Sequence, residues 1–349
     1  MIIRKIFQRK YQELTGCLHV HTKYSFDSRT PVEDVIKAAY KHNLDYIAIN
    51  DHLSNEAKED KSLKAEKKLT IIPGFEINDP DNNNHLLVYG NEEVLRNKPA
   101  GEYVPYYRNQ GAITFAAHPF ERRSSRQIRK YVWTDTSIDQ FSGLEIWNAL
   151  SNWVSKIRPS INGLLWVLLA HNFIRRGSRA SIQWWDDLNK AGKRKAAIGS
   201  VDAHGLIFKK MCFSFTLLKH KFMFNTVRTN VLLPEDWEIN KENILKALAE
   251  GRSYVINYHR GIPYNFYAGI SAQNEPGVSF GEEIEFRQGL HYYYHLPKIA
   301  RVRLYYNGDL ISQQLDEKGR FEINSPGNYR LEVLLNRLGW IYTNNIYIK

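Results

Sequence analysis

The first residues whose types and spacing indicate chemistry are His19 and His21, which stand at the end of an apolar run that begins at Leu14. The run favours a β-strand, and alternate side chains of a strand lie on one face, so the two imidazoles point the same way. Two neutral imidazoles directed into one space are the beginning of a metal site. Asp27 follows on a predicted loop, from which its carboxylate could return to the same space.

Further histidines and carboxylates stand next to apolar, β-favouring runs. They are Asp51 and His52 after Tyr46–Ile49, Glu76 after Leu69–Phe75, His85 before Leu86–Tyr89, His118 after Ala112–Ala117, and Asp202 with His204 after Ala196–Val201. All except His85 follow the carboxyl end of their run. Loops at the carboxyl ends of strands meet at one edge of an α/β fold and assemble its functional site there. The sequence therefore predicts one shared site.

The segments that carry these residues resemble the motifs of the PHP (polymerase and histidinol phosphatase) family, especially its metal-dependent phosphoesterase branch. They are LHVHTKYSFD, INDH, PGFEIN, NHLLVYG, AAHPF and SVDAHG, which follow the family's order between residues 18 and 204. The resemblance implies a distorted seven-stranded α/β barrel that holds two or three divalent metal ions. It implies that a first ion would take His19, His21, Glu76 and Asp202, a second would share Glu76 and add His85 and His118, and a third would take Asp27, His52 and His204.

The implied ligands are imidazoles and carboxylates without a thiolate, which suits Zn²⁺, Mn²⁺ or iron and does not choose among them. Ions roughly 3.5–4 Å apart lower the pKa of a bridging water and give a hydroxide nucleophile near neutral pH. Three ligand carboxylates contribute about −3 and three divalent ions about +6, so the site favours an anionic ester. We expect a metal-dependent phosphoesterase acting on a small metabolite or nucleotide, with Glu76 as the bridge and His204 or a metal-bound water as the acid. Asp51 is expected to support the ligands rather than to bind metal.

Positive charge is concentrated near the predicted site. The segment 118–221 contains 18 Lys and Arg residues against 7 Asp and Glu, whereas the rest of the chain has 30 of each. The candidates to bind substrate phosphate, because they follow ligand-bearing loops, are Arg122, Arg123, Lys209 and Lys210. Asn148, which ends the predicted strand Gly143–Asn148, could bind substrate or a metal-bound water, or could cap a turn.

Other functions remain open on the sequence alone. A nuclease is the main alternative because of the basic segment, but the segment lacks the clustered aromatic residues of a single-strand stacking platform. Nucleic acid is therefore a less favoured partner than a small phosphorylated substrate. Hydrolysis of a carbamate or carboxylic ester needs the same ligands, and a metal-binding interaction module without activity is the least favoured alternative.

The elements that must position these residues alternate between strand and helix. Pro31 to His42 has apolar residues at helical spacing between two predicted strands, which is typical of a parallel sheet. Residues 1–258 are expected to form the barrel. Residues 270–349 change to short alternating runs, with Asn307-Gly308 as a tight-hairpin signal, and are expected to form a small antiparallel β-sandwich.

Cysteine usage and apolar runs indicate the compartment. Cys17 and Cys212 match no metal or redox spacing, so two buried thiols are expected rather than a disulfide. The basic N-terminal stretch lacks the apolar core of a secretory signal, and Ile161–Ile174 is too short to span a bilayer. These features predict a cytoplasmic protein without a membrane span.

Overall fold

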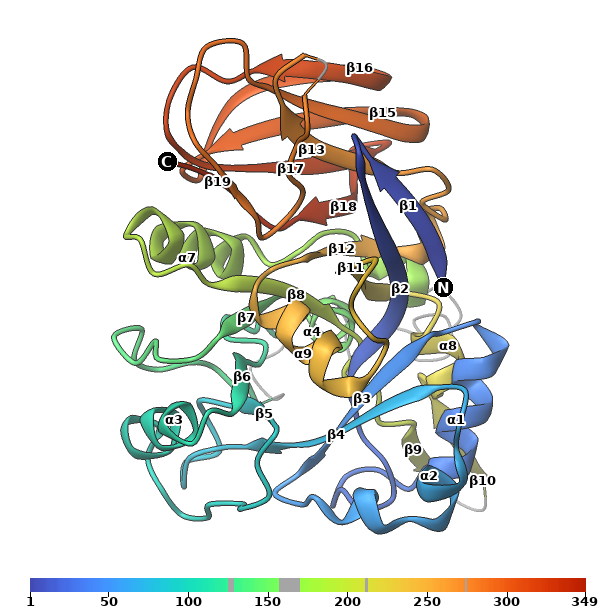
Figure 1. Ribbon diagram of the computed structural model, residues 1–349. Coiled ribbons are helices and arrows are strands. Elements are labelled where there is room, and N and C mark those ends of the chain that lie inside the picture. The colour runs from blue at the N-terminus through green and yellow to red at the C-terminus, as the bar shows by residue number, and fades with distance from the viewer. Residues whose placement is uncertain (125–128, 157–169, 211–212, 274) are drawn as a thin grey trace.

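The computed structural model describes residues 1–124, 129–156, 170–210, 213–273 and 275–349 (Figure 1). Its strands are β1 (Ile2–Ile6), β2 (Arg9–Val20), β3 (Tyr46–His52), β4 (Thr70–Ile77), β5 (Leu86–Tyr89), β6 (Ile113–Ala116), β7 (Gly143–Asn148), β8 (Ala196–Ser200), β9 (Leu206–Lys210), β10 (Phe213–Leu217), β11 (Val227–Pro234), β12 (Ser253–Asn257), β13 (Tyr267–Ser271), β14 (Glu283–Ile284), β15 (His291–Tyr306), β16 (Asp309–Glu322), β17 (Gly327–Leu335), β18 (Leu338–Thr343) and β19 (Ile346–Ile348). Its helices are α1 (Val32–Lys41), α2 (Lys61–Ala65), α3 (Ala100–Asn109), α4 (Ala149–Val154), α6 (Ala170–Phe173), α7 (Arg179–Lys190), α8 (His220–Met223) and α9 (Lys241–Ala249), with 3₁₀ turns at Glu56–Glu59 and Tyr258–Arg260.

Strands β2 to β8 pair in chain order and form the part of the sheet that carries the site. The pairs β2–β3, β3–β4, β6–β7 and β7–β8 are parallel, whereas β4–β5 and β5–β6 are antiparallel. Beyond β8 the chain returns to the end of β2, where the amide of Val201 donates to the carbonyl of Leu18 (3.1 Å) and the amide of His21 donates to that of Ala203 (3.0 Å). The predicted mixed α/β fold is confirmed in this coarse form.

Helix α1 forms where the sequence predicts it. Pro31 precedes its first residue. The carboxylates of Glu33 and Asp34 lie in its first turn, where they interact favourably with the positive end of the helix dipole. The apolar residues at helical spacing, Val32, Val35, Ile36 and Ala39, are its buried face. This face packs into the same apolar core as β2 and β3, so the helix fixes the strands that end at the site.

The C-terminal strands form a largely antiparallel arrangement at one end of the molecule, drawn in orange and red in Figure 1. Strand β15 pairs with β13, β16 and β17. The predicted hairpin is present, because Asn307 and Gly308 alone separate the paired residues Tyr306 and Asp309. Their positive φ angles, 46° and 87°, are those of the turn that matches the twist of paired strands.

Polar contacts tie the C-terminal strands to the rest of the chain. Strand β12 pairs with β18, so the sheet is continuous across the predicted boundary. Arg330 and Asp186 form a buried bidentate ion pair at 2.8 and 2.7 Å. The Asn344 side chain bonds to both the amide and the carbonyl of Ala197, at 2.7 and 2.9 Å. These contacts hold the C-terminal strands against β8 and α7.

Two sequence expectations concern residues outside or at the edge of the described ranges. Cys17 is fully buried, whereas Cys212 lies outside the described residues, as does the greater part of Ile161–Ile174. In the part of the chain that the structure describes, no helix is long and apolar enough to cross a membrane.

Candidate metal centre

Strand register places the predicted ligands side by side. Parallel pairing of β3 with β4 sets His52 directly opposite Glu76. A parallel bridge joins Val20 to Ala203, so the residues that flank the two bridge positions are neighbours. Those flanking residues are His19, His21, Asp202 and His204. The carboxyl ends of β2, β3, β4 and β8 thus deliver their side chains to one place.

Glu76 is the carboxylate around which the histidines gather, and its side chain is fully buried. Its Oε1 lies 2.8 Å from Nδ1 of His85 and 3.3 Å from Nε2 of His118. Its Oε2 faces Nε2 of His19 at 3.0 Å, Nδ1 of His52 at 3.2 Å and Nε2 of His21 at 3.5 Å. The two oxygens therefore face different imidazoles, which is the arrangement needed for one carboxylate to join two cations.

Two further carboxylates lie beside this group. Oδ1 of Asp202 is 3.4 Å from Nε2 of His21 and 3.4 Å from Nδ1 of His204. Oδ2 of Asp27 is 3.1 Å from Nε2 of His204 and 3.4 Å from Nε2 of His52. The Asp27 side chain is 31% exposed, whereas that of Asp202 is 7% exposed, so Asp27 stands at the solvent side of the cluster.

All nine predicted ligands fall into overlapping sets whose ligand atoms lie within 4.8 Å of one another. The sets are His21, Asp27, His52 and His204; His19, His21 and Glu76; His19, His118 and Asp202; and His52, Glu76 and His85. The buried atoms Nε2 of His21 and Nδ1 of His52 have no hydrogen-bond partner among the described residues. Because an unpaired buried polar atom is costly, nitrogens directed into a cluster of carboxylates fit a bound cation.

Backbone conformation at the cluster is unusual. His19, His118 and Asp202 have φ angles of 61°, 29° and 54°, in the left-handed region that residues other than glycine rarely adopt. Such residues persist where the surrounding structure holds them, and they concentrate at functional sites. Here the amide of Ala203 donates to the carbonyl of His19 at 3.2 Å and helps to hold one of them.

Burial and neighbouring charges set the pKa values of the site. Burial opposes ionisation of Glu76, but the surrounding histidines outweigh it and hold its pKa well below the usual range. Burial alone would lower the pKa of His118 and of His204, but Glu76 and Asp27 respectively raise each to about 9. Burial, reinforced by His204, lowers the pKa of His21 to about 3. His21 is therefore a neutral imidazole at neutral pH, which is the form that binds a metal ion.

Glu145, for which no role was predicted from the sequence, accepts hydrogen bonds from the proposed ligands His19 and His118. Its buried carboxylate accepts from Nδ1 of His19 at 2.7 Å and from the amide of His118 at 2.8 Å. A carboxylate that holds one ring nitrogen of a histidine directs the other nitrogen toward the metal. The available signal was an acidic residue inside the otherwise apolar run Gly143–Trp147.

Asn148 contacts Glu145 directly, whereas Asp51 bonds to Thr22. The amide nitrogen of Asn148 donates to Glu145 at 2.9 Å and to Asp202 at 3.1 Å, while its oxygen caps α4 by accepting from the amide of Ser151. Both expected roles of Asn148, beside the site and as a cap, are thus compatible with its position. Asp51 accepts from the Thr22 hydroxyl at 2.7 Å, and burial raises the pKa of Asp51 to about 6. Asp51 belongs to none of the donor sets found among the described residues.

The four predicted phosphate-binding cations differ in their surroundings. Arg122 is exposed and lines a pocket beside the metal centre. Arg123 pairs with Glu121, and its Nε donates to the carbonyl of Arg129 at 2.9 Å. Lys209 and Lys210 lie in β9, and their side chains are outside the described part of the chain. Of the four candidates, Arg122 therefore lies next to the proposed ligands, and it forms no ion pair with any described residue.

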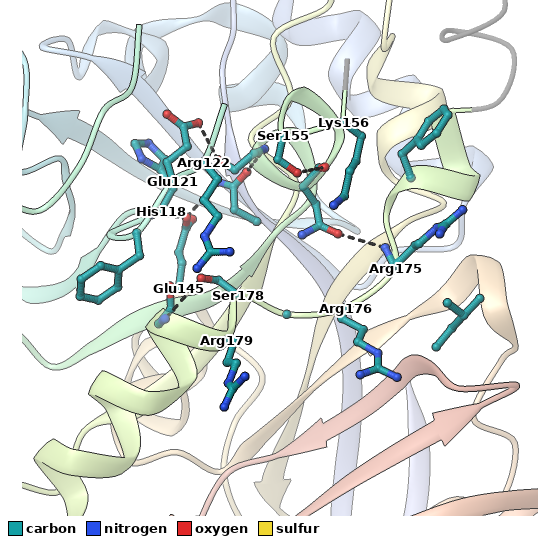
Figure 2. Close-up of a pocket in the computed structure, with 18 of the residues that line it drawn as sticks. His118, Glu121, Arg122, Glu145, Ser155, Lys156, Arg175, Arg176, Ser178 and Arg179 are labelled. Carbon is teal, nitrogen blue, oxygen red and sulfur yellow. Dashed lines mark hydrogen bonds between the residues drawn. The ribbon is translucent and has the colours of Figure 1, made fainter. Parts of the chain in front are cut away.

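The pocket has a volume of about 480 Å³ and opens beside the metal centre. Figure 2 shows His118 and Glu145 together with Arg122 at one part of its lining. Arg175, Arg176 and the start of α7 contribute another part. A ligand in this pocket would therefore contact the centre and a group of cations at once.

Comparison with known proteins gives a family match and several similar solved structures. Similar solved structures include a two-domain protein from Bacteroides vulgatus that contains a predicted PHP-like metal-dependent phosphoesterase (17% identity, covering 96% of this chain and 95% of that chain, TM-score 0.48). They also include PsfC from Pseudomonas syringae (15% identity, covering 69% of this chain and 90% of that chain, TM-score 0.41). No curated protein matches this chain in sequence. Residues 18–101 match the family described as PHP domain. This matched segment holds six of the nine predicted ligands, namely His19, His21, Asp27, His52, Glu76 and His85.

Proposed function

We propose that the protein is a metal-dependent phosphoesterase that hydrolyses the phosphate ester of a small metabolite or nucleotide. The observation that carries the proposal is the buried Glu76, whose two oxygens face different histidines, with two unpartnered imidazole nitrogens beside it. Carboxylate and imidazole donors at this density fit two or three divalent ions of zinc, manganese or iron.

The ions would be held by the nine clustered residues. We propose His19, His21, Glu76 and Asp202 for the first, Glu76, His85 and His118 for the second, and Asp27, His52 and His204 for the third. When bound, divalent ions supply a hydroxide nucleophile from water near neutral pH and neutralise the phosphate oxygens. His52 contacts both Glu76 and Asp27, so it links the second and third groups.

The chain's own residues orient and charge this site. Glu145 holds the ring of His19 through Nδ1, so that Nε2 is directed at Glu76. Asn148 donates to both Glu145 and Asp202, so it holds the two carboxylates in one arrangement. His204, whose Nε2 lies 3.1 Å from Oδ2 of Asp27 at the solvent side of the cluster, is the residue we propose to protonate the leaving group when the third group holds no ion.

The strand arrangement supports a division into two units. We propose that residues 1–258 form a distorted seven-stranded barrel of strands β2–β8 and that residues 270–349 form a β-sandwich. The continuous pairing of β2–β8, and the return of the chain after β8 to β2, support the barrel. A separate apolar core that is made mostly of residues from β13 to β19 supports the second unit.

The decisive experiment is a hydrolysis screen with Mn²⁺, Zn²⁺ or Fe²⁺ over sugar phosphates, mononucleotides and short oligonucleotides. Phosphate release from small esters that chelation abolishes and metal restores is the expected result. The pocket volume of about 480 Å³ suits a small molecule. A nuclease would instead prefer oligonucleotides and lose affinity steeply with added salt, and that result would reverse the proposal.

A further inference from the structure

The pocket beside the metal centre contains more positive charge than the reaction at one phosphate needs. Its cationic side chains are Arg122, Lys156, Arg175, Arg176, Arg179 and Arg337. In the described ranges, none of them forms an ion pair with a carboxylate. Since like charges repel, six such groups around one cavity favour a ligand that neutralises them.

The two carboxylates of the pocket do not neutralise this charge. Glu121 pairs with Arg123 and accepts from the Ser151 hydroxyl at 2.8 Å. Glu145 holds His19 and the amide of His118. Six cations against two carboxylates leave a formal charge of +4 on the lining, and both carboxylates have partners of their own.

One cation comes from the C-terminal strands. Arg337 lies in the turn between β17 and β18, where Asn336 and Arg337 have φ angles of 48° and 66°. The turn is tied to the barrel side of the pocket, because Nε of Arg176 donates to the carbonyl of Arg337 at 3.0 Å and the amide of Gly339 donates to that of Arg175 at 2.8 Å. Figure 2 shows Arg176 extending toward these strands. The C-terminal unit therefore forms one wall of the pocket.

The same pocket is lined by His118 and Glu145, so one small ligand can reach both the metal centre and the cations. A guanidinium presents paired donors that match the oxygens of a phosphate. A volume of about 480 Å³ accommodates a small molecule with two such groups. The lining charge of +4 suits a phosphate dianion better than a single carboxylate.

We propose that this pocket is a subsite for a second phosphate group, and that Arg337 is a specificity-determining residue. The inference rests on the proposed function. The substrate would be a small bisphosphorylated molecule with one phosphate ester at the metal centre and the other phosphate among the arginines. Water adds its oxygen to the first phosphorus, the ester P–O bond breaks, the alcohol oxygen takes a proton, and inorganic phosphate and a monophosphorylated alcohol leave.

Matched substrates test the subsite. We would measure kcat/KM for fructose 1,6-bisphosphate and glycerate 2,3-bisphosphate against fructose 6-phosphate and glycerate 3-phosphate. Arg337→Asn removes the charge while asparagine tolerates the left-handed backbone, and Arg320→Asn is the control because Arg320 is exposed on β16 outside this pocket. Arg337→Asn should lower kcat/KM for the bisphosphates roughly ten-fold, mainly through KM, and clearly less for the monophosphates. Equal losses on both classes, or none, would overturn the inference.

A binding measurement separates this inference from the proposed reaction. Titration calorimetry of the chelator-treated protein with the same bisphosphates should detect binding that Arg337→Asn weakens and Arg320→Asn retains, because the subsite does not consist of metal ligands. Binding without hydrolysis of any ester would refute the proposed function and leave the subsite standing. Hydrolysis of monophosphates with no preference for bisphosphates would refute the subsite alone, and a steeply salt-dependent preference for oligonucleotides would identify the cations as a nucleic-acid contact.

Discussion

Replacing Glu145 by glutamine should weaken metal binding although Glu145 is not itself a proposed ligand. One carboxylate oxygen accepts from Nδ1 of His19 at 2.7 Å, and the other accepts from the amide of His118 at 2.8 Å and from Asn148 at 2.9 Å. All three partners donate. Glutamine offers one acceptor and one donor, so a donor must face a donor in either orientation of the amide.

The size of the effect follows from the bond that is lost. A buried hydrogen bond to a charged group contributes about 1.5–3 kcal/mol, which corresponds to roughly ten- to a hundred-fold in metal affinity or in kcat/KM. Competition with a fluorescent chelator measures the metal affinity. Glu13→Gln is the matched control, because Glu13 is 3% exposed and bonded to Asn230 at 2.9 Å but belongs to none of the metal donor sets. Unchanged metal affinity in Glu145→Gln, or an equal loss in Glu13→Gln, would refute the proposed role.

Four further substitutions have defined outcomes. Glu76→Gln should abolish hydrolysis and reduce metal content while the circular dichroism spectrum is retained. Asp27→Asn should have a milder effect, because Asp27 contacts only the third ligand group. Equal effects of the two substitutions would contradict the proposal that Glu76 bridges two ions. Asp186→Asn leaves the Arg330 charge buried and incompletely compensated, so urea denaturation should show a loss of about 3–5 kcal/mol. Burial lowers the pKa of Lys195 from its usual 10.5 to about 8 in the folded protein. Between these two pH values the unfolded chain binds more protons than the folded protein, so the free energy of unfolding should rise with pH. Lys195→Met should flatten this rise relative to the wild type.

Eight of the nine proposed metal ligands could be predicted because each stands next to an apolar run in the sequence, whereas Asp27 lies on the loop that follows His21. Strand ends alone predict that His52, Glu76 and His118 meet at one edge of the sheet. The resemblance then added a role for His85, which precedes its strand instead of following it. Glu145 was missed because a single acidic residue within a strand carries no spacing signal, and its function depends on contacts with His19 and His118, which lie 126 and 27 positions away.

Some parts of the fold could not be predicted from the sequence. The N-terminal hairpin of β1 and β2 turns at Phe7, which has a φ of 55° but is neither glycine nor asparagine, so no turn was predicted there. The C-terminal hairpin at Asn307-Gly308 carried that signal and was predicted. Of the six cations that line the pocket, Arg122 alone was predicted from the sequence, because Arg176 and Arg337 meet only through tertiary packing.

The number of metal ions bound by the purified protein tests the proposed metal centre most directly. Elemental analysis of the wild-type chain should give at least two zinc, manganese or iron ions per chain, as a shared carboxylate between ions requires. The Glu76→Gln variant, purified in parallel, should bind fewer. Less than one ion per wild-type chain after reconstitution with each metal would contradict the account.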